Sequence, residues 1–433
     1  MPPGINFGGV MVTAAPLPET GTNRIPDEFH SYWQTLEKPG VRRARAACLV
    51  LFGFDPVPTP EQVLHFAHGH YDTDPVAEAF VAEVYDALGT AEGRRMLDSA
   101  LNDGLDAVAD PPPSLVALMA ELTAEPDWLD WELLERGAKV LRGFGPAVAS
   151  SAGSGTLLAY TESSIAKPLS LTGAYAGDSA LRRFMETQRH TFDISEPGGM
   201  RPGGPGWMSS ARVRVMHVFL RRRIAGHPEW DADAWGEPIN QSDAEMTLLS
   251  GSVVMALSMC AIGHPVTRRD TEALMHLWRY VGHVMGVHPR WYPQTVGEAV
   301  QLTMVYFLKR AHSAAGDGTE LIESYLRAFR PESGTGWRRR IRDEANYRAQ
   351  IGYARYWLPG SFYRSYDMPF AWPWALHPLL QAPGNLALGL ARKSSRRLDA
   401  AGDRLARRRR EAWFAREMGK QESRFAAREK FRR

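Results

Sequence analysis

The sequence contains very little cysteine, and Cys48 and Cys260 are its only two thiols among 433 residues. Two cysteines so far apart cannot form a disulfide framework or a thiolate zinc site, and their scarcity is typical of a reducing compartment. Residues 1–23 also lack the basic stretch and following apolar run of a secretory signal. The sequence therefore predicts a cytoplasmic protein.

Internal repeats and alternating strand patterns are scarce as well, which argues against solenoid and propeller architectures. Helix signals dominate instead: Pro60 and Asp74 mark helix starts, and Pro126-Asp127 precedes a helix rich in tryptophan and leucine. Glycine and proline crowd residues 195–207, which predicts a loop. With 44% hydrophobic and 23% charged residues, the composition is that of a globular protein. We predict an all-α fold with a single large helical domain.

Long uninterrupted apolar runs are missing too. The run at residues 246–262 is about 17 residues long, which is short for a membrane span, so we predict a buried core helix. Residues 368–391 contain no Asp, Glu, Lys or Arg, but four prolines interrupt them, which argues against a membrane helix. We predict that this segment packs against the domain, and the alternative is a patch at a membrane surface.

Positive charge is concentrated at one end of a nearly neutral chain. The net charge is +2, whereas residues 391–433 contain 16 Lys and Arg against 6 Asp and Glu. Such a segment is typical of a solvated helix or of a peripheral contact with acidic lipids or an acidic partner. We expect no nucleic-acid partner. The chain divides into an N-terminal extension (1–44), a catalytic domain (45–390) and a basic helical tail (391–433).

A helix is predicted at residues 209–224, and it carries a histidine on its apolar face. A serine at its start can act as the N-cap. His217 lies within a stripe formed by Val213, Met216, Leu220 and Ile224. An imidazole among aliphatic side chains needs a partner for its nitrogens. That partner is either a metal ion or a backbone carbonyl, and the helix pattern alone favours the carbonyl.

Three motifs in order give a more specific indication. They are Arg212-Val213-Arg214-Val215-Met216-His217, Gly236-Glu237-Pro238-Ile239-Asn240-Gln241-Ser242-Asp243, and Trp278-Arg279-Tyr280-Val281-Gly282 followed by Met285-Gly286. Over roughly residues 45–380 the chain resembles the catalytic domain shared by latex clearing proteins and MpaB-type oxygenases. The resemblance implies a globin-like helical core that binds haem b. It also implies that His217 ligates the haem iron.

The resemblance further implies a haem-dependent oxygenase that acts on a hydrophobic, isoprenoid or lipid-like substrate. Oxidative cleavage of a carbon–carbon double bond by dioxygen is the expected reaction. A single protein ligand would leave the opposite face of the iron open to dioxygen. Arg212 and Arg214 lie within about one to two turns of His217 and are expected to pair with haem propionates. A cytoplasmic location would favour a lipid or terpenoid over an extracellular polymer.

On the distal side, latex clearing proteins carry an Arg, Lys, Thr cluster roughly thirty residues before the axial histidine. Arg183 and Thr187 match this cluster and share a helical face. Glu186 stands where those enzymes have a lysine that approaches the iron, so a lysine-type closure is in doubt. A carboxylate here can serve as a base instead. Glu162, near Lys167, is a second candidate for the catalytic glutamate.

Two other classes of function compete with the oxygenase. One is a non-catalytic scaffold, either haem-binding or haem-free, that uses the basic tail to bind a membrane or a protein. The other is a metal hydrolase, because His68, His70 and Asp72 form a His-x-His-x-Asp motif whose side chains suit zinc, iron or manganese. Such a motif normally follows a strand, and strand patterns are scarce here.

Overall fold

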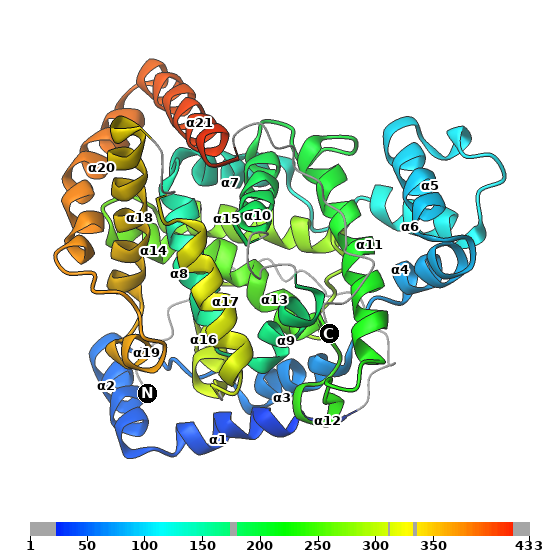
Figure 1. Ribbon diagram of the computed structural model, residues 1–433, viewed down its shortest axis with the longest axis horizontal. Helices are drawn as coiled ribbons and strands as arrows, with labels where there is room; N and C mark the ends of the chain where they lie inside the picture. Colours follow the sequence, from blue (N-terminus) through cyan, green and yellow to red (C-terminus); the bar gives the residue numbers. More distant parts are fainter. Residues whose placement is uncertain (1–22, 174–179, 311, 332–335, 419–433) are drawn as a thin grey trace, which may run out of the picture.

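A computed structural model describes residues 23–173, 180–310, 312–331 and 336–418, and every regular element in these ranges is a helix (Figure 1). This confirms the predicted all-α class. Residues 1–22 of the predicted extension and 419–433 of the predicted tail lie outside the described residues.

The α-helices are α1 (Ser31–Leu36), α2 (Pro39–Phe52), α3 (Pro60–His68), α4 (Pro75–Phe80), α5 (Thr90–Asp103), α6 (Pro113–Thr123), α7 (Trp131–Gly143), α8 (Ala147–Ala159), α9 (Ser163–Thr172), α10 (Ala180–Ser195), α11 (Pro205–Ala225), α12 (Ala232–Trp235), α13 (Gln241–Leu249), α14 (Met255–Ala261), α15 (Arg268–Val284), α16 (Val296–Lys309), α17 (Ala315–Ala328), α18 (Trp337–Trp357), α19 (Gly360–Ser365), α20 (His377–Ser394) and α21 (Arg396–Met418). Shorter turns of 3₁₀- or π-helix are η1 (Asp27–His30), η2 (Gly69–Tyr71), η3 (Val81–Asp86), η4 (Leu105–Ala107), η6 (Ser250–Val254) and η7 (Trp374–Leu376).

Local signals in the sequence explain several helix starts. Thr59 and the side chain of Gln62 form a capping box at α3, and the Asp74 carboxylate accepts a hydrogen bond from Ala77 N at 3.2 Å at α4. Pro126-Asp127 precedes α7, which begins at Trp131 as a helix rich in tryptophan and leucine. The predicted start of α11 was wrong by about one turn, because this helix begins at Pro205 and the serines at 209 and 210 lie inside it instead of capping it.

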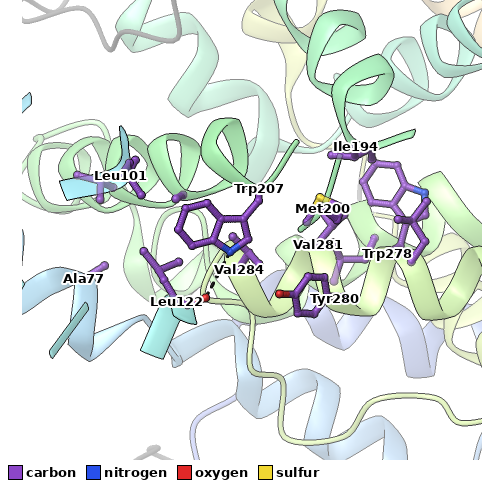
Figure 2. Close-up of a cluster of buried hydrophobic side chains, with 14 of the residues drawn as sticks. Ala77, Leu101, Leu122, Ile194, Met200, Trp207, Trp278, Tyr280, Val281 and Val284 are labelled. Atoms are coloured by element: carbon purple, nitrogen blue, oxygen red, sulfur yellow. Dashed lines mark hydrogen bonds between the residues drawn. The ribbon is translucent and has the colours of Figure 1, made fainter. Parts of the chain in front are cut away.

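The centre of the molecule is the antiparallel pair formed by α7 and α15 with α11 beside it (Figure 1). A side chain at Gly137 would collide with the backbone carbonyl of Ala273, so only glycine permits this close approach of α7 to α15. The buried cluster around α15 contains Trp207 of α11, whose indole N–H donates to Leu122 O at 3.3 Å (Figure 2). This contact joins α11 to α6 through the core.

The apolar run predicted as a core helix forms one continuous helix, Gln241–Ala261, made of α13, η6 and α14. By length and hydropathy it would be able to cross a membrane, a test that core helices of soluble proteins also pass. Half of its most apolar window is buried inside the structure, against α15, α16 and α8. The structure therefore places it as a core element.

The predicted basic tail begins as the end of α20 and continues as α21. Helix α21 packs against α7 and α10, where Arg410 donates to Ser195 Oγ at 2.6 Å and Arg142 pairs with Asp403 at 2.8 Å. The described part of the tail, residues 391–418, is therefore docked through one face rather than solvated all round. Helix α20 packs on α18 and α21 with one side only, so the predicted packing of residues 368–391 holds for half of that segment.

The close approach at Gly137 generates a prediction with a matched control. We expect Gly137→Ala to lower the free energy of unfolding by about 1–3 kcal/mol, because the new methyl group meets backbone that cannot move freely. Gly155 also lies inside a helix, but a Cβ there meets nothing, so Gly155→Ala should raise stability by about 0.5–1 kcal/mol. Urea denaturation of both variants measures the difference, and equal effects would contradict the close packing of α7 on α15.

Candidate functional site

His217 lies in the second half of α11 and makes no hydrogen bond to any described residue. Burial, followed by the charge of Arg221 and the nearby His190, lowers the pKa of His217 to about 4. The imidazole is therefore neutral near pH 7, with a lone pair on one nitrogen. Around it, Val213, Met216 and Leu220 are only partly buried. The neutral imidazole of His217 is thus surrounded on α11 by apolar side chains that remain partly exposed to solvent.

Helix α10 runs antiparallel to α11, and two contacts fix their register. A Cβ at Gly206 would lie 2.5 Å from Ile194 Cα, and His190 Nε2 lies 3.0 Å from Ser210 Oγ. Each step back along α10 matches a step forward along α11. Continued in this way, the register brings position 183 of α10 level with His217.

The predicted distal residues contact one another on α10. Arg183 Nη1 donates to Glu186 Oε2 at 2.8 Å, and the Thr187 hydroxyl donates to the backbone oxygen of Arg183 at 3.2 Å. Arg182 approaches the other oxygen of Glu186 at 3.4 Å. Glu186 is buried, whereas Thr187 is exposed. Arg183, Glu186 and His190 lie at i, i+3 and i+7 and share one side of α10, and His190 contacts Ser210 of α11.

The two arginines predicted to bind haem propionates both hold carboxylates of the protein. Arg212 pairs with Asp98 at 2.7 Å in a half-exposed contact. Arg214 is buried and donates to both oxygens of Asp74, at 2.7 and 2.8 Å, and to Glu121 at 3.1 Å. These ion pairs do not favour a propionate role, which stays a prediction. They give Arg214 a positioning role for α11 instead.

Neighbouring residues make room for the ion pairs of Arg214 and hold its carboxylate partners. A side chain at Gly286 would overlap the Asp74 carboxylate, so this glycine, with φ of +71°, makes room for the pair. His288 Nε2 lies 2.9 Å from Glu121. Burial alone would raise the pKa of Glu121, but the hydrogen bond with His288 and the charge of Arg214 lower it to about 2. Glu121 is therefore held as an anion beside Arg214.

Glu162 belongs to a different group of contacts. It lies just before α9, is buried, and accepts hydrogen bonds from Thr161 Oγ1 at 3.1 Å and Arg310 Nε at 3.3 Å. It also lines a very small cavity with His70 and Lys309. Its role as a base remains a prediction.

Lys167 of α9 is held by two carboxylates. Its ammonium pairs with Asp317 at 2.6 Å and with Glu229 at 3.1 Å. Both contacts favour the charged form and raise the pKa of Lys167, although burial opposes them. The structure thus gives this lysine a structural ion pair.

The His-x-His-x-Asp motif does not form a metal-binding cluster. His70 Nδ1 lies 3.0 Å from Phe66 O and its Nε2 lies 3.2 Å from Lys309 Nζ, while Asp72 is held by Arg290 at 2.6 Å. Within the described ranges no group of three or more His, Cys, Asp and Glu residues is placed to hold a metal ion. The geometry therefore gives the hydrolase hypothesis no support.

Two further residues lie near His217, and of these only His190 was not considered from the sequence. Arg221, four positions after His217, is buried and donates to the backbone oxygens of Pro238 and Ile239 at 3.1 and 2.6 Å. His190 is buried, and burial lowers its pKa to about 4. The i+4 spacing of His190 from Glu186 was the available signal, since it places both on one helical face.

Comparison with known proteins gives three consistent matches. Residues 131–382 match the family described as "ER-bound oxygenase mpaB/B'/Rubber oxygenase, catalytic domain". Over 232 residues the chain is 29% identical to the rubber oxygenase of Streptomyces sp. (strain K30), and the alignment covers 52% of this chain and 54% of that protein. The chain thus spans about half the length of this relative.

Among solved structures, that of latex clearing protein in the closed state has a similar fold. The TM-score is 0.56 at 20% sequence identity, and the superposition covers 81% of this chain and 89% of the other. At this level of identity the likeness concerns the fold, and it agrees with the all-helical architecture described above.

The contrast between neighbouring arginines of α11 generates a second prediction. Arg214→Gln leaves two carboxylates near the core without their cation, so we expect a loss of about 3–5 kcal/mol in the free energy of unfolding. Arg212→Gln removes an exposed pair and should cost less than about 1 kcal/mol. Urea titration of both variants tests this, and similar losses in the two would refute the positioning role of Arg214.

Proposed function

This chain belongs to the family of MpaB and rubber oxygenase catalytic domains, and we propose that it is a haem b-dependent oxygenase with His217 as the iron ligand. The substrate we propose is hydrophobic, isoprenoid or lipid-like, and the reaction is oxidative cleavage of a carbon–carbon double bond by dioxygen. The name of its relative, rubber oxygenase, supports this class of substrate.

The observation that carries the proposal is the state of His217. A neutral imidazole without a hydrogen-bond partner among the described residues is suited to coordinate a metal ion through its free lone pair. A porphyrin supplies four nitrogen ligands, so haem iron needs only one from the protein. The residues around His217 therefore fit haem, whereas a metal held by protein groups alone would need a cluster of ligands.

Side chains next to His217 on α11, and those of Arg183 and Glu186 on α10, would supply the groups that a haem site needs. Val213, Met216 and Leu220 offer apolar surface to a flat hydrophobic group. When bound, haem iron would supply the site that activates dioxygen. On the opposite helix, Arg183 would donate hydrogen bonds to developing negative charge on oxygen, and Glu186 would hold or accept a proton.

The first test of the function is the haem content of the purified chain. We expect the wild-type protein to show a Soret band and a pyridine haemochrome spectrum of haem b. His217→Ala should lose this band, since no other ligand lies in the same position, and added imidazole should partly restore it. His190→Gln serves as the matched control and should keep its haem, because His190 already shares a hydrogen bond with Ser210.

Two outcomes would contradict the assignment. Normal haem spectra in His217→Ala would exclude this residue as the ligand. Absence of porphyrin in the wild-type chain, even after reconstitution with haemin, would favour the scaffold function.

The role of Glu186 is tested by turnover rather than by haem content. We expect Glu186→Gln to keep its haem and to slow dioxygen uptake with an isoprenoid substrate such as squalene by about 100-fold or more, the size typical of a lost acid or base. Glu92→Gln is the control, because Glu92 forms a similar ion pair with Arg95 three residues away, at the surface. An unchanged rate in Glu186→Gln would rule out a proton-transfer role.

A further inference from the structure

Helix α20 presents an unusually apolar surface to solvent. On its outer side, Leu379, Leu380, Leu386 and Leu390 are exposed, Leu380 to 77%. Leu379, Leu386 and Leu390 recur at helical spacing, and Leu380 lies about 100° away around the helix, so together they form a broad apolar stripe. Figure 1 shows α20 at the edge of the molecule, with α18 and α21 against its other side. This stripe has no partner within the described part of the chain.

Two exposed aromatic side chains precede the helix in the sequence. Phe370 is 81% exposed and Trp372 is 47% exposed. Arg355 lies over the Trp372 ring at 5.5 Å. From residue 368 to residue 391 the chain contains no Asp, Glu, Lys or Arg. An uncharged helix face with aromatic residues at one end is typical of a segment that lies in the interfacial region of a bilayer.

The other end of α20 borders a cationic groove. The groove has a volume of about 680 Å³ and lies between α7, the turn before α15 and the end of α20. Its charged lining has six basic against four acidic residues: Arg136, Lys139, Arg142, Arg392, Lys393 and Arg396 against Glu132, Glu135, Asp270 and Asp399. The buried Nε2 of His264, another lining residue, has no hydrogen-bond partner. Arg136 and Lys393 approach Asp270, Lys139 and Arg392 pair with Asp399, and Arg142 pairs with Asp403. The lining therefore keeps a small excess of basic residues, with Arg396 outside these pairs, beside the unpartnered Nε2 of His264.

We propose that this protein docks peripherally on an anionic lipid bilayer through the α20 face, defined as Phe370, Trp372 and the exposed leucines of α20. The apolar stripe enters the interfacial layer, and the groove at its end accepts phosphate-containing headgroups. A bilayer supplies hydrocarbon and anionic groups side by side, which matches the arrangement on this face. The inference does not depend on haem binding or on oxygenase activity.

Flotation of the full-length protein with lipid vesicles tests the proposal. The probes are vesicles of phosphatidylcholine alone and vesicles with roughly one-third phosphatidylserine. We expect binding to the anionic vesicles only. Leu380→Gln with Leu390→Gln should lower the partition coefficient about tenfold or more, because two exposed leucines no longer enter the bilayer. Both positions face solvent, so circular dichroism and thermal unfolding should match those of the wild type.

Two further variants separate this face from other surfaces. Lys393→Glu with Arg396→Glu should abolish the preference for phosphatidylserine, whereas Arg338→Glu with Arg340→Glu, an equal change of charge on exposed residues of α18, should keep it. Leu51→Gln with Phe52→Gln tests another exposed apolar segment, at the end of α2. Loss of binding in this last variant combined with normal binding of the α20 variant would overturn the proposal.

Other results would also overturn it. Binding that is insensitive to the leucine substitutions would mean that the arginine-rich tail alone attracts the vesicles. No binding to either vesicle, together with a dimer that the Leu380→Gln, Leu390→Gln variant dissociates in sedimentation velocity, would mean that a second copy of the chain covers α20.

Discussion

The buried guanidinium of Arg214 fixes the helix on which the proposed site depends. Its ion pairs with Asp74 and Glu121 join α11 to the start of α4 and to α6. One turn beyond His217, the guanidinium of Arg221 is also buried, and it donates to the backbone oxygen of Pro238 and to Glu78 Oε1, the latter at 3.2 Å. Two buried cations would be costly alone, so their acceptors must be in place for α11 to pack at all. The position of His217 between them follows from this constraint.

Arg214, His217 and Arg221 lie at i−3, i and i+4, so they share one side of α11. His190 of α10 lies near His217 and contacts Ser210 of α11, one turn before Arg214. The loop at 196–204 then fixes the register, since Gly206 packs directly on Ile194. A substituted glycine at this crossing would push the helices apart and shift Arg183 relative to His217. The contact between Gly206 and Ile194 thus helps to set the relative positions of Arg183 and His217, although it lies several turns away from both.

Much of this architecture could be predicted from sequence, and the failures have a common physical cause. Caps and breakers act locally, so the starts of α3 and α4 were predictable, and so was the loop at 196–204, although the prediction extended it to residues 195–207, whose last three belong to α11. Side-chain partners are set by tertiary packing. Arg212 and Arg214 look equivalent in the motif, yet two positions on a helix point in nearly opposite directions, toward Asp98 and Asp74. The pairing of Glu162 with Arg310 is likewise invisible in the sequence.

Helix α20 shows why composition alone could not decide between core and surface. An uncharged stretch suits either environment, and its prolines exclude only a membrane-spanning helix. The structure resolves the choice by splitting the segment. Met368, Ala371 and Pro378 are buried against the protein, whereas the leucines one face away remain in solvent. Exposure of large leucines costs free energy unless a partner covers them. The groove at the end of the helix carries more basic than acidic residues, which favours an anionic partner. Apolar area and charge therefore point to the same partner from independent observations.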